Sequence, residues 1–340
     1  MTSVFDTVVA QFEGVVSALL QPTQFLSDPS KRIFWAYLVV SVLLAGLVFA
    51  FRDGRRWSKH LYENLLSPRL WFHPSSRVDF KLMLVKSLVR TLLFASWLVS
   101  SHGLAVGVVR FANDQFGPAS GLVWSATAVT IVYTVVLFVS SDFSRYLVHR
   151  LCHQVPLLWQ FHQVHHSAEV MTPLTLYRSH PVENLIFVLR GIVVMGSVTG
   201  VFYYLFGTQA VQVQILGVNA LGLLFNMLGA NLRHSHVWIS YGSVVERVLL
   251  SPAQHQLHHS KAPRHYGANY GSCLAIWDWL GGSLHLAKGQ KGLRFGVADT
   301  ELNHDPHALG STLLGPFRGC WRLIAGWVRA RLPASRVECD

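Results

Sequence analysis

Residues 33–51 constrain the fold most, because these nineteen consecutive residues include no charged side chain. At about 1.5 Å per residue, a helix of this length nearly crosses the roughly 30 Å hydrocarbon layer of a bilayer. The whole chain is 51% hydrophobic and only 13% charged, which is too apolar for an ordinary soluble domain. The sequence therefore predicts an integral membrane protein.

Four more apolar runs follow, at residues 88–109, 122–139, 185–206 and 211–228. Only residues 207–210 separate the last two runs, which indicates a hairpin that dips into or through the bilayer. We predict an all-α helical bundle with about four to five membrane-embedded helices. Apolar positions within residues 1–30 indicate an additional interfacial or packing helix.

The distribution of charge predicts the orientation in the membrane. Residues 52–81 carry seven Lys or Arg against three acidic residues, whereas residues 110–121 carry one of each sign. Since short basic loops stay on the cytoplasmic side, residues 52–87, 140–182 and 230–340 are expected there. The C-terminus lacks a dilysine-like retrieval signal, which favours a bacterial inner membrane. The net charge of +11 is attributed to loops beside anionic lipid rather than to nucleic-acid binding.

Histidine clusters carry the chemistry. Eleven of the eighteen histidines lie between residues 149 and 259. Three clusters stand out: His149-x3-His153, His162-x2-His165-His166 and His255-x2-His258-His259. Residues three and four apart share one face of a helix, so each cluster aims its imidazoles in a common direction. All of them fall on the predicted cytoplasmic face, in a cap of short helices beside the membrane.

So many histidines exceed what one tetrahedral zinc ion uses, so two metal ions are the economical interpretation. Two other classes stay open at this point: a histidine-rich metal transporter and a membrane protein with a haem held by two histidines. A zinc protease is disfavoured because no His-Glu-x-x-His motif occurs.

The order of these motifs resembles the fatty acid hydroxylase/sterol desaturase superfamily of integral-membrane di-iron enzymes. The resemblance covers about residues 125–285. Its supporting fragments are Asp142-x6-His149, Trp159-x2-His162, His180-Pro181-x-Glu183-Asn184, Asn231-x2-His234-Ser235, Pro252-x2-His255, Asn269-Tyr270-Gly271 and Trp277-Asp278.

The resemblance implies a set of metal ligands. These are His149, His153, His162, His165, His166, His180, His234, His255, His258 and His259. For His180 the alternative is a bond to a backbone carbonyl. His236 stands where relatives have Asn and is expected beside the ligands, not among them. Asp142 and Asp278 are expected to orient imidazole N–H groups.

The implied activity is hydroxylation or desaturation of a lipid by a membrane-bound enzyme with two iron ions, which uses dioxygen and external electrons. The sequence lacks a fused cytochrome b5 motif and a flavin or nucleotide fingerprint, so a separate ferredoxin or cytochrome b5-type donor with its reductase is expected. We expect membrane helices and a basic loop over residues 1–121, the catalytic domain over 122–285 and a cytoplasmic tail over 286–340.

The remaining histidines are expected to play no part in the site. Six of them lie in polar loops and are predicted to be solvated: His60, His73, His265, His285, His304 and His307. His102 lies within an apolar run and is expected to face a substrate channel or to bond to a neighbouring helix.

Overall fold

The protein is described by a computed structural model that covers residues 4–94, 100–119, 122–210, 212–216, 218–289, 292–298, 302 and 304–331. Within these residues the chain is mostly helical. Its β-structure there amounts to one antiparallel hairpin of strands β1 (Gln214–Ile215) and β2 (Val218–Asn219), besides two isolated bridges. The predicted all-α class is therefore confirmed.

Among the described residues, seven helices are long, and shorter helices connect them. The long helices are α1 (Val4–Gln24), α2 (Trp35–Asp53), α5 (Pro74–Phe94), α6 (Ser101–Phe116), α7 (Ala126–Gln154), α9 (Pro181–Phe206) and α14 (Leu309–Arg331). The short α-helices are α3 (Trp57–Leu61), α4 (Pro68–Trp71), α8 (Pro156–His166), α10 (Ala220–Met227), α11 (Gly242–Val245), α12 (Pro252–His258) and α13 (Ile276–Leu280). Single helical turns of other types are η1 (Gly54–Arg56), η2 (Tyr62–Leu66), η3 (Pro173–Tyr177), η4 (Gly207–Gln209), η5 (Ala230–His234) and η6 (Pro263–His265).

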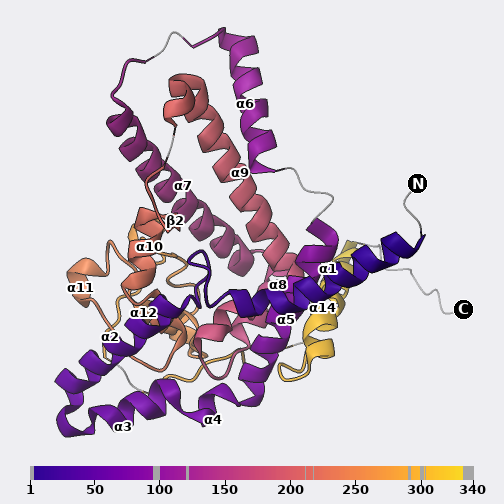
Figure 1. Ribbon diagram of the computed structural model, residues 1–340. Helices are drawn as coiled ribbons and strands as arrows, with labels where there is room; N and C mark the ends of the chain where they lie inside the picture. The colour runs from indigo at the N-terminus through magenta and orange to yellow at the C-terminus, as the bar shows by residue number, and fades with distance from the viewer. Residues whose placement is uncertain are drawn as a thin grey trace, which may run out of the picture.

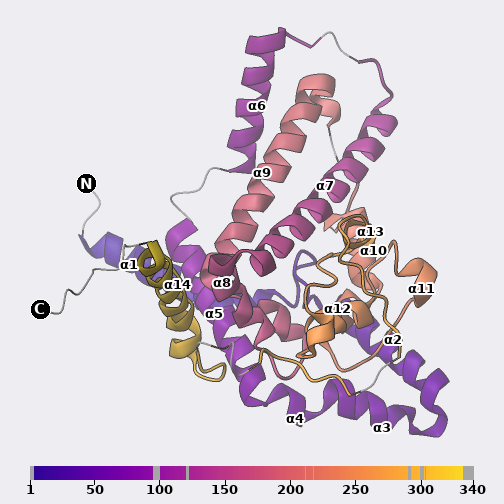
Figure 2. The same ribbon diagram turned by 180° about the vertical axis from the view of Figure 1, so that it is seen from behind.

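Helices α6, α7 and α9 form a column that rises from a broader base (Figures 1 and 2). Small residues let α6 and α9 approach closely. A Cβ atom added at Gly200 would lie 2.6 Å from Cβ of Val108, and one added at Gly196 would lie 2.7 Å from Cβ of Leu104. Glycine at these two positions therefore sets the spacing of the column, as small residues do between membrane helices.

Helix α7 carries the third predicted apolar run directly into the first histidine cluster. Ser125 caps its N-terminus by accepting a hydrogen bond from the backbone N–H of Ala128. Pro156, directly after the C-cap Val155, starts α8 in a new direction. One continuous helix, α7, therefore carries both the third apolar run and the histidines His149 and His153.

Two predicted membrane runs differ from the structure. The run at residues 88–109 is not one helix, because α5 ends at Phe94 and Ser100 caps the new helix α6; residues 95–99 between them lie outside the described residues. The run at 211–228 is wrong as a spanning helix. Its start forms the β1–β2 hairpin, where Leu216 adopts a positive φ, and Asn219 then caps the eight-residue helix α10. Eight residues extend only about 12 Å, far less than a bilayer.

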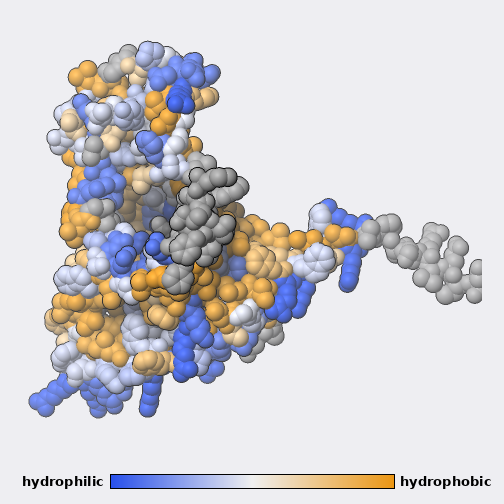
Figure 3. All heavy atoms as spheres, turned by 45° about the vertical axis from the view of Figure 1, so that its right-hand side comes forward, coloured by the Kyte–Doolittle hydropathy of each residue, from blue (hydrophilic) through white to orange (hydrophobic). Residues whose placement is uncertain are grey.

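Three segments of the described chain are long and apolar enough to cross a membrane: Trp35–Trp71, Ala126–Gln154 and Pro181–Gln209. In α2, one stripe of large apolar side chains is exposed at intervals of four residues. This stripe consists of Trp35, Val39, Leu43, Leu47 and Phe51. The opposite stripe packs inward and consists of Tyr37, Ser41, Ala45 and Phe49. Figure 3 shows a broad hydrophobic patch below the column, with hydrophilic side chains projecting from the lower end. Both features fit a protein surrounded by lipid.

The histidine motifs lie on the C-terminal part of α7 and on α8 and α12. Figure 2 shows α8 and α12 in the base, below α7. Residues after 285 pack onto this base, since a β-bridge pairs Ser260 with Phe295 and α14 lies against α8. The predicted domain boundaries at 121 and 285 stay predictions.

Candidate metal centre

Nine of the predicted ligands come together in two neighbouring clusters. Cluster A consists of His149, His153, His162, His166 and His258. Cluster B consists of His165, His234, His255 and His259. Within each cluster, one ligand atom from every residue lies within 4.8 Å of the others. Residues far apart in the sequence therefore converge as the histidine spacing predicted, although binding of metal by them stays a prediction.

Helical spacing explains how two elements serve both clusters. On α8, His162 and His166 are four residues apart and point to cluster A, whereas His165 points to cluster B. On α12, His258 belongs to cluster A, and His255 belongs to cluster B together with the C-cap residue His259. The clusters touch where the rings of His166 and His259 stack, with centroids 4.4 Å apart.

Hydrogen bonds fix the tautomers of two facing imidazoles in cluster A. Nδ1 of His149 lies 2.7 Å from the carbonyl oxygen of Tyr270, and Nδ1 of His258 lies 2.8 Å from that of Ala268. A carbonyl oxygen only accepts, so both Nδ1 atoms carry a proton and donate. In neutral rings both Nε2 atoms then present lone pairs, yet these atoms lie only 3.1 Å apart. Two lone pairs that face each other at this distance repel, and a cation between them would satisfy both.

Similar short separations join Nε2 of His162 to Nε2 of His166, at 3.2 Å, and Nε2 of His234 to Nε2 of His255, at 3.0 Å. With metal–nitrogen bonds of about 2.0–2.1 Å, two ligands at right angles around one ion lie about 3 Å apart. The two nitrogen atoms that bind a haem iron from opposite sides lie about 4 Å apart, which is twice the length of one metal–nitrogen bond. The geometry therefore fits imidazoles that share one ion and disfavours the haem alternative.

Buried imidazole nitrogens without a partner supply a second test of fit. Among the described residues, Nε2 of His153 and both ring nitrogens of His259 have no hydrogen-bond partner. A buried polar atom without a partner is costly, and metal coordination would satisfy these atoms. Burial also lowers the pKa of His162 to about 3 and that of His165 to about 4, so both rings are neutral at pH 7. Neutral imidazole is the form that binds metal.

Partners outside the clusters orient two more rings, those of His162 and His165. Nδ1 of His162 lies 2.9 Å from a carboxylate oxygen of Glu183, and both residues are buried. Nδ1 of His165 lies 3.0 Å from the carbonyl oxygen of Arg178. In each case the acceptor holds the proton on Nδ1 and turns Nε2 toward the cluster.

The predicted roles of Asp142 and Asp278 need correction, because the hydrogen bonds of these carboxylates go to other groups than imidazoles. Asp142 accepts from the backbone N–H groups of Cys273 and Leu274 and from the indole N–H of Trp277. Asp278 accepts from the backbone N–H groups of Tyr270 and Gly271 and from the hydroxyl of Ser283. Both therefore shape the loop that places the Tyr270 carbonyl against His149, and they act on the ligand only through this loop.

His180 lies outside both clusters, and we withdraw it from the ligand set. Its Nδ1 caps α9 by accepting from the backbone N–H of Val182, and its Nε2 donates to the carbonyl oxygen of Leu313 at 3.0 Å. With both ring nitrogens used, His180 ties the start of α9 to α14. This is the carbonyl bond that the sequence left open as its alternative.

His236 also lies outside the clusters, as expected. Its Nε2 accepts a hydrogen bond from the backbone N–H of Met171, and its ring packs against Phe295. Two residues earlier, His234 lies in cluster B.

Among the loop histidines, the prediction of solvent exposure is wrong for His265 and His304, which are both buried. His102 is exposed in the first turn of α6.

A cavity of about 250 Å³ opens beside cluster A. His153, His166 and His258 form part of its wall. The remaining wall is largely aromatic or apolar and consists of Trp159, Ser260, Tyr266, Gly267, Tyr270, Gly296 and Val297. The cavity therefore gives a small, mostly apolar group access to the imidazoles of cluster A.

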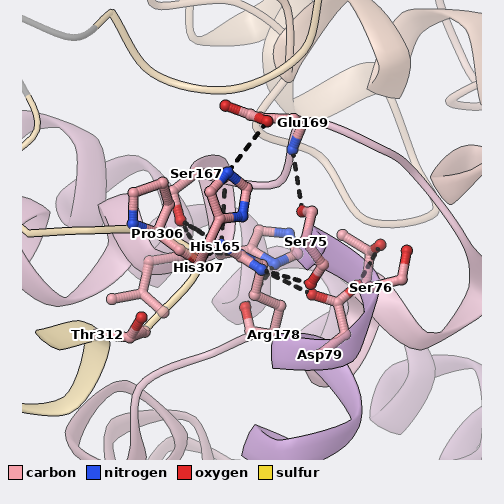
Figure 4. A network of polar contacts seen from close by, with 12 residues as sticks. Ser75, Ser76, Asp79, His165, Ser167, Glu169, Arg178, Pro306, His307 and Thr312 are labelled. Atoms are coloured by element: carbon pink, nitrogen blue, oxygen red, sulfur yellow. Dashed lines mark hydrogen bonds and ion pairs between the residues drawn. The ribbon is translucent and has the colours of Figure 1, made fainter. Parts of the chain in front are cut away.

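Sequence reasoning missed the buried arginine that braces cluster B (Figure 4). The Arg178 guanidinium bonds to a carboxylate oxygen of Asp79 at 2.9 Å, and both side chains are fully buried. It also donates to oxygens of Ser75, Ser167 and Pro306. Ninety-nine residues separate Arg178 from Asp79, so no local pattern connects them. Glu183 was visible as part of a family fragment, but its partner His162 lies twenty-one residues away.

Comparisons with known proteins agree with the geometry. Residues 134–283 match the sequence profile of the fatty acid hydroxylase family. The chain is 30% identical over 159 residues to the ornithine lipid hydroxylase OlsE of Rhizobium tropici, a match that covers 46% of this chain and 43% of that protein. It is 31% identical over 146 residues to the alkylglycerol monooxygenase of Homo sapiens, covering 43% of this chain and 29% of that protein. The matched region thus spans less than half of either relative, and no solved structure matches the chain.

Proposed function

Because this chain carries a domain of the fatty acid hydroxylase/sterol desaturase superfamily over residues 134–283, we propose that it is a membrane-bound, dioxygen-dependent lipid hydroxylase with two iron ions. One observation carries the proposal: nine histidines, most of them buried, form two adjoining clusters, one of which holds facing Nε2 lone pairs.

Cluster A would hold one ion and cluster B the other. Imidazole binds several transition metals, and the family resemblance favours iron. When bound, the two irons would supply the activation of dioxygen that the insertion of oxygen into an unactivated C–H bond requires.

The side chains of the protein hold and orient the ligands. Glu183 and the carbonyl groups of Tyr270 and Ala268 keep the protons of their imidazole partners on Nδ1, away from the metal positions. This arrangement fixes the direction of three Nε2 atoms before a metal binds, so binding requires little reorganisation.

The substrate is a lipid, and the reaction is hydroxylation in preference to desaturation. Proteins similar to this chain include an ornithine lipid hydroxylase, alkylglycerol monooxygenases and a fatty acid hydroxylase of Lecanicillium. The mostly apolar cavity beside cluster A has room for a stretch of acyl or alkyl chain next to the metal positions.

We further propose that the site faces the cytoplasm of a bacterial cell and receives electrons from a separate ferredoxin or cytochrome b5-type protein. The basic residues around positions 52–81 support this orientation. Cysteine substitution tests it: Gln115→Cys in the exposed end of α6 should react with an impermeant thiol reagent outside intact cells, and Arg264→Cys near the site should not. Ser260 is unsuitable for this purpose because it is buried.

The experiment for the function compares the lipids of cells that express the protein and its variants. Cells with the native chain should accumulate a lipid heavier by one oxygen atom, as detected by mass spectrometry. His258→Asn should abolish this product, whereas His307→Asn, which changes a partly exposed histidine paired with Glu169, should retain it. A product that survives His258→Asn would overturn the proposed site, and a desaturated product would correct the reaction type.

A further inference from the structure

Helix α14 exposes a large apolar face that the described part of the chain leaves uncovered. Side chains on this face follow one another at intervals of three and four residues, which is the period of one helical stripe. They are Leu314, Phe317, Trp321, Ile324 and Val328. Trp321 is 72% exposed, and the neighbouring Trp327 is 57% exposed. Such a continuous apolar patch is unusual on a surface that meets only water.

The opposite face of the N-terminal half fixes α14 to the protein. Small residues on that face are buried: Thr312, Gly315, Pro316 and Gly319. The helix packs on α8. Phe317, which is half-exposed at the border of the apolar face, places its ring 5.3 Å from that of Phe161. The backbone of Leu313 also accepts the hydrogen bond from His180. The apolar face is therefore held in one orientation by the same base that holds the metal centre.

A basic stripe borders the apolar face. Arg318, Arg322 and Arg329 follow one another at steps of four and seven residues, and all three are exposed. Residues 309–331 contain no acidic side chain. A fourth arginine, Arg331, stacks its guanidinium 3.6 Å from the ring centroid of Trp327. The helix thus combines an apolar face, two exposed tryptophans and a border on which every charged side chain is positive.

We propose that α14 inserts its apolar face into the surface layer of a bilayer that contains anionic lipid, with the arginine stripe at the phosphate level. A basic helix with Trp, Phe and Leu on its other face is the pattern of helices that lie in the membrane interface. The bilayer is expected nearby, because α14 packs against α8 and α5 at the foot of the column of α6, α7 and α9 (Figures 1 and 2). Two helices of this column, α7 and α9, are long and apolar enough to span a membrane.

A second copy of the chain is the other candidate for this face, and charge disfavours it. Pairing two apolar faces would bring two stripes of arginine together without an acidic partner on α14. Anionic headgroups neutralise the same stripe. The inference goes beyond the hydroxylase activity and stands independently of it.

The test measures how close α14 lies to acyl chains in the full-length protein. Single cysteines replace Ile324 or Gly326 in a Cys320→Ser, Cys339→Ser background, and each carries a fluorescent label. Position 324 lies on the apolar face, whereas position 326 lies across the helix, where an added side chain meets open space. The variants are reconstituted in nanodiscs of phosphatidylcholine and phosphatidylglycerol with brominated acyl chains, which quench nearby fluorophores.

We expect the label at 324 to be quenched severalfold more than the label at 326. Val328→Cys provides a second position on the apolar face if Ile324→Cys fails to fold. Replacing the three arginines of the stripe by glutamine, or omitting phosphatidylglycerol, should reduce quenching at 324. Equal quenching at 324 and 326 would overturn the proposal. Disulfide cross-links between two Ile324→Cys chains without quenching would also overturn it and would assign the face to a second copy.

Discussion

Replacement of Glu183 by glutamine should weaken metal binding in cluster A and leave cluster B intact. The Glu183 carboxylate lies 2.9 Å from Nδ1 of His162, and these two side chains are buried. Glutamine keeps the length of the side chain and an acceptor oxygen, but it lacks the negative charge of the deprotonated carboxyl. Burial raises the pKa of Glu183 to about 7, so the assay is run above pH 7, where this charge is present. Because His162 belongs to cluster A alone, the effect should be confined to one of two ions.

The magnitude follows from the kind of bond that is lost. A hydrogen bond to a charged group contributes about 1.5–3 kcal/mol, against about 1 kcal/mol for a neutral pair. The difference of about 0.5–2 kcal/mol corresponds to a reduction of metal affinity by about 2–30-fold. Loss of an outer partner of a metal-bound histidine typically reduces affinity by about 10–100-fold, a range that overlaps the upper part of this value.

The assay titrates the purified, iron-loaded protein with a chelator and follows iron per chain. Glu183→Gln should release one equivalent at a lower chelator concentration than the native protein, and the other equivalent at an unchanged concentration. Glu169→Gln is the matched control, because Glu169 is exposed and pairs with His307, and neither residue belongs to a histidine cluster. Native behaviour of Glu183→Gln, or equal weakening of both equivalents, would refute the assignment of Glu183 to a single ion.

Three further predictions concern the base, the column and the ligand set. Asp79→Ala leaves the fully buried guanidinium of Arg178 without its ion partner and should lower the free energy of unfolding by about 3–5 kcal/mol, as measured by thermal unfolding in detergent. Asp28→Ala breaks a partly exposed pair with Lys31 and should cost less than about 1 kcal/mol in the same assay. Gly200→Ala places a Cβ 2.6 Å from Val108 and should cost about 1–3 kcal/mol, whereas Gly191→Ala meets open space and should be neutral; equal melting temperatures would contradict the close packing of α6 on α9. His234→Asn should lose iron, whereas His236→Asn should keep it, and the reverse result would mean that the ligand at this turn is misassigned.

Local periodicity made the ligand positions predictable. Spacings of three and four residues place His162 and His166 on one side of α8, and proline marks the start of that helix and of α12. The nine histidines converge because these two short helices pack in the same base as the end of α7. To predict the two clusters, one would also need to know how α8 and α12 are oriented relative to each other, which the sequence does not specify.

The features that the sequence analysis missed or left open depend on contacts between distant segments of the chain. Arg178 bonds to Asp79 across ninety-nine residues, and His180 bonds to the backbone of Leu313 across 133 residues. Asp142 was expected to orient an imidazole, but it bonds to the loop that follows Gly271. Hydropathy misjudged residues 211–228, because a run of apolar residues does not reveal the turn that ends at Asn219.

The most direct test of the account is the metal content of the purified full-length protein, measured by elemental analysis together with an optical spectrum. We predict about two irons per chain, one for each histidine cluster, and no haem absorption band. His166→Ala and His259→Ala, one from each cluster, should each reduce the iron content. A haem band, or iron that remains when both histidines are replaced, would contradict the proposed centre.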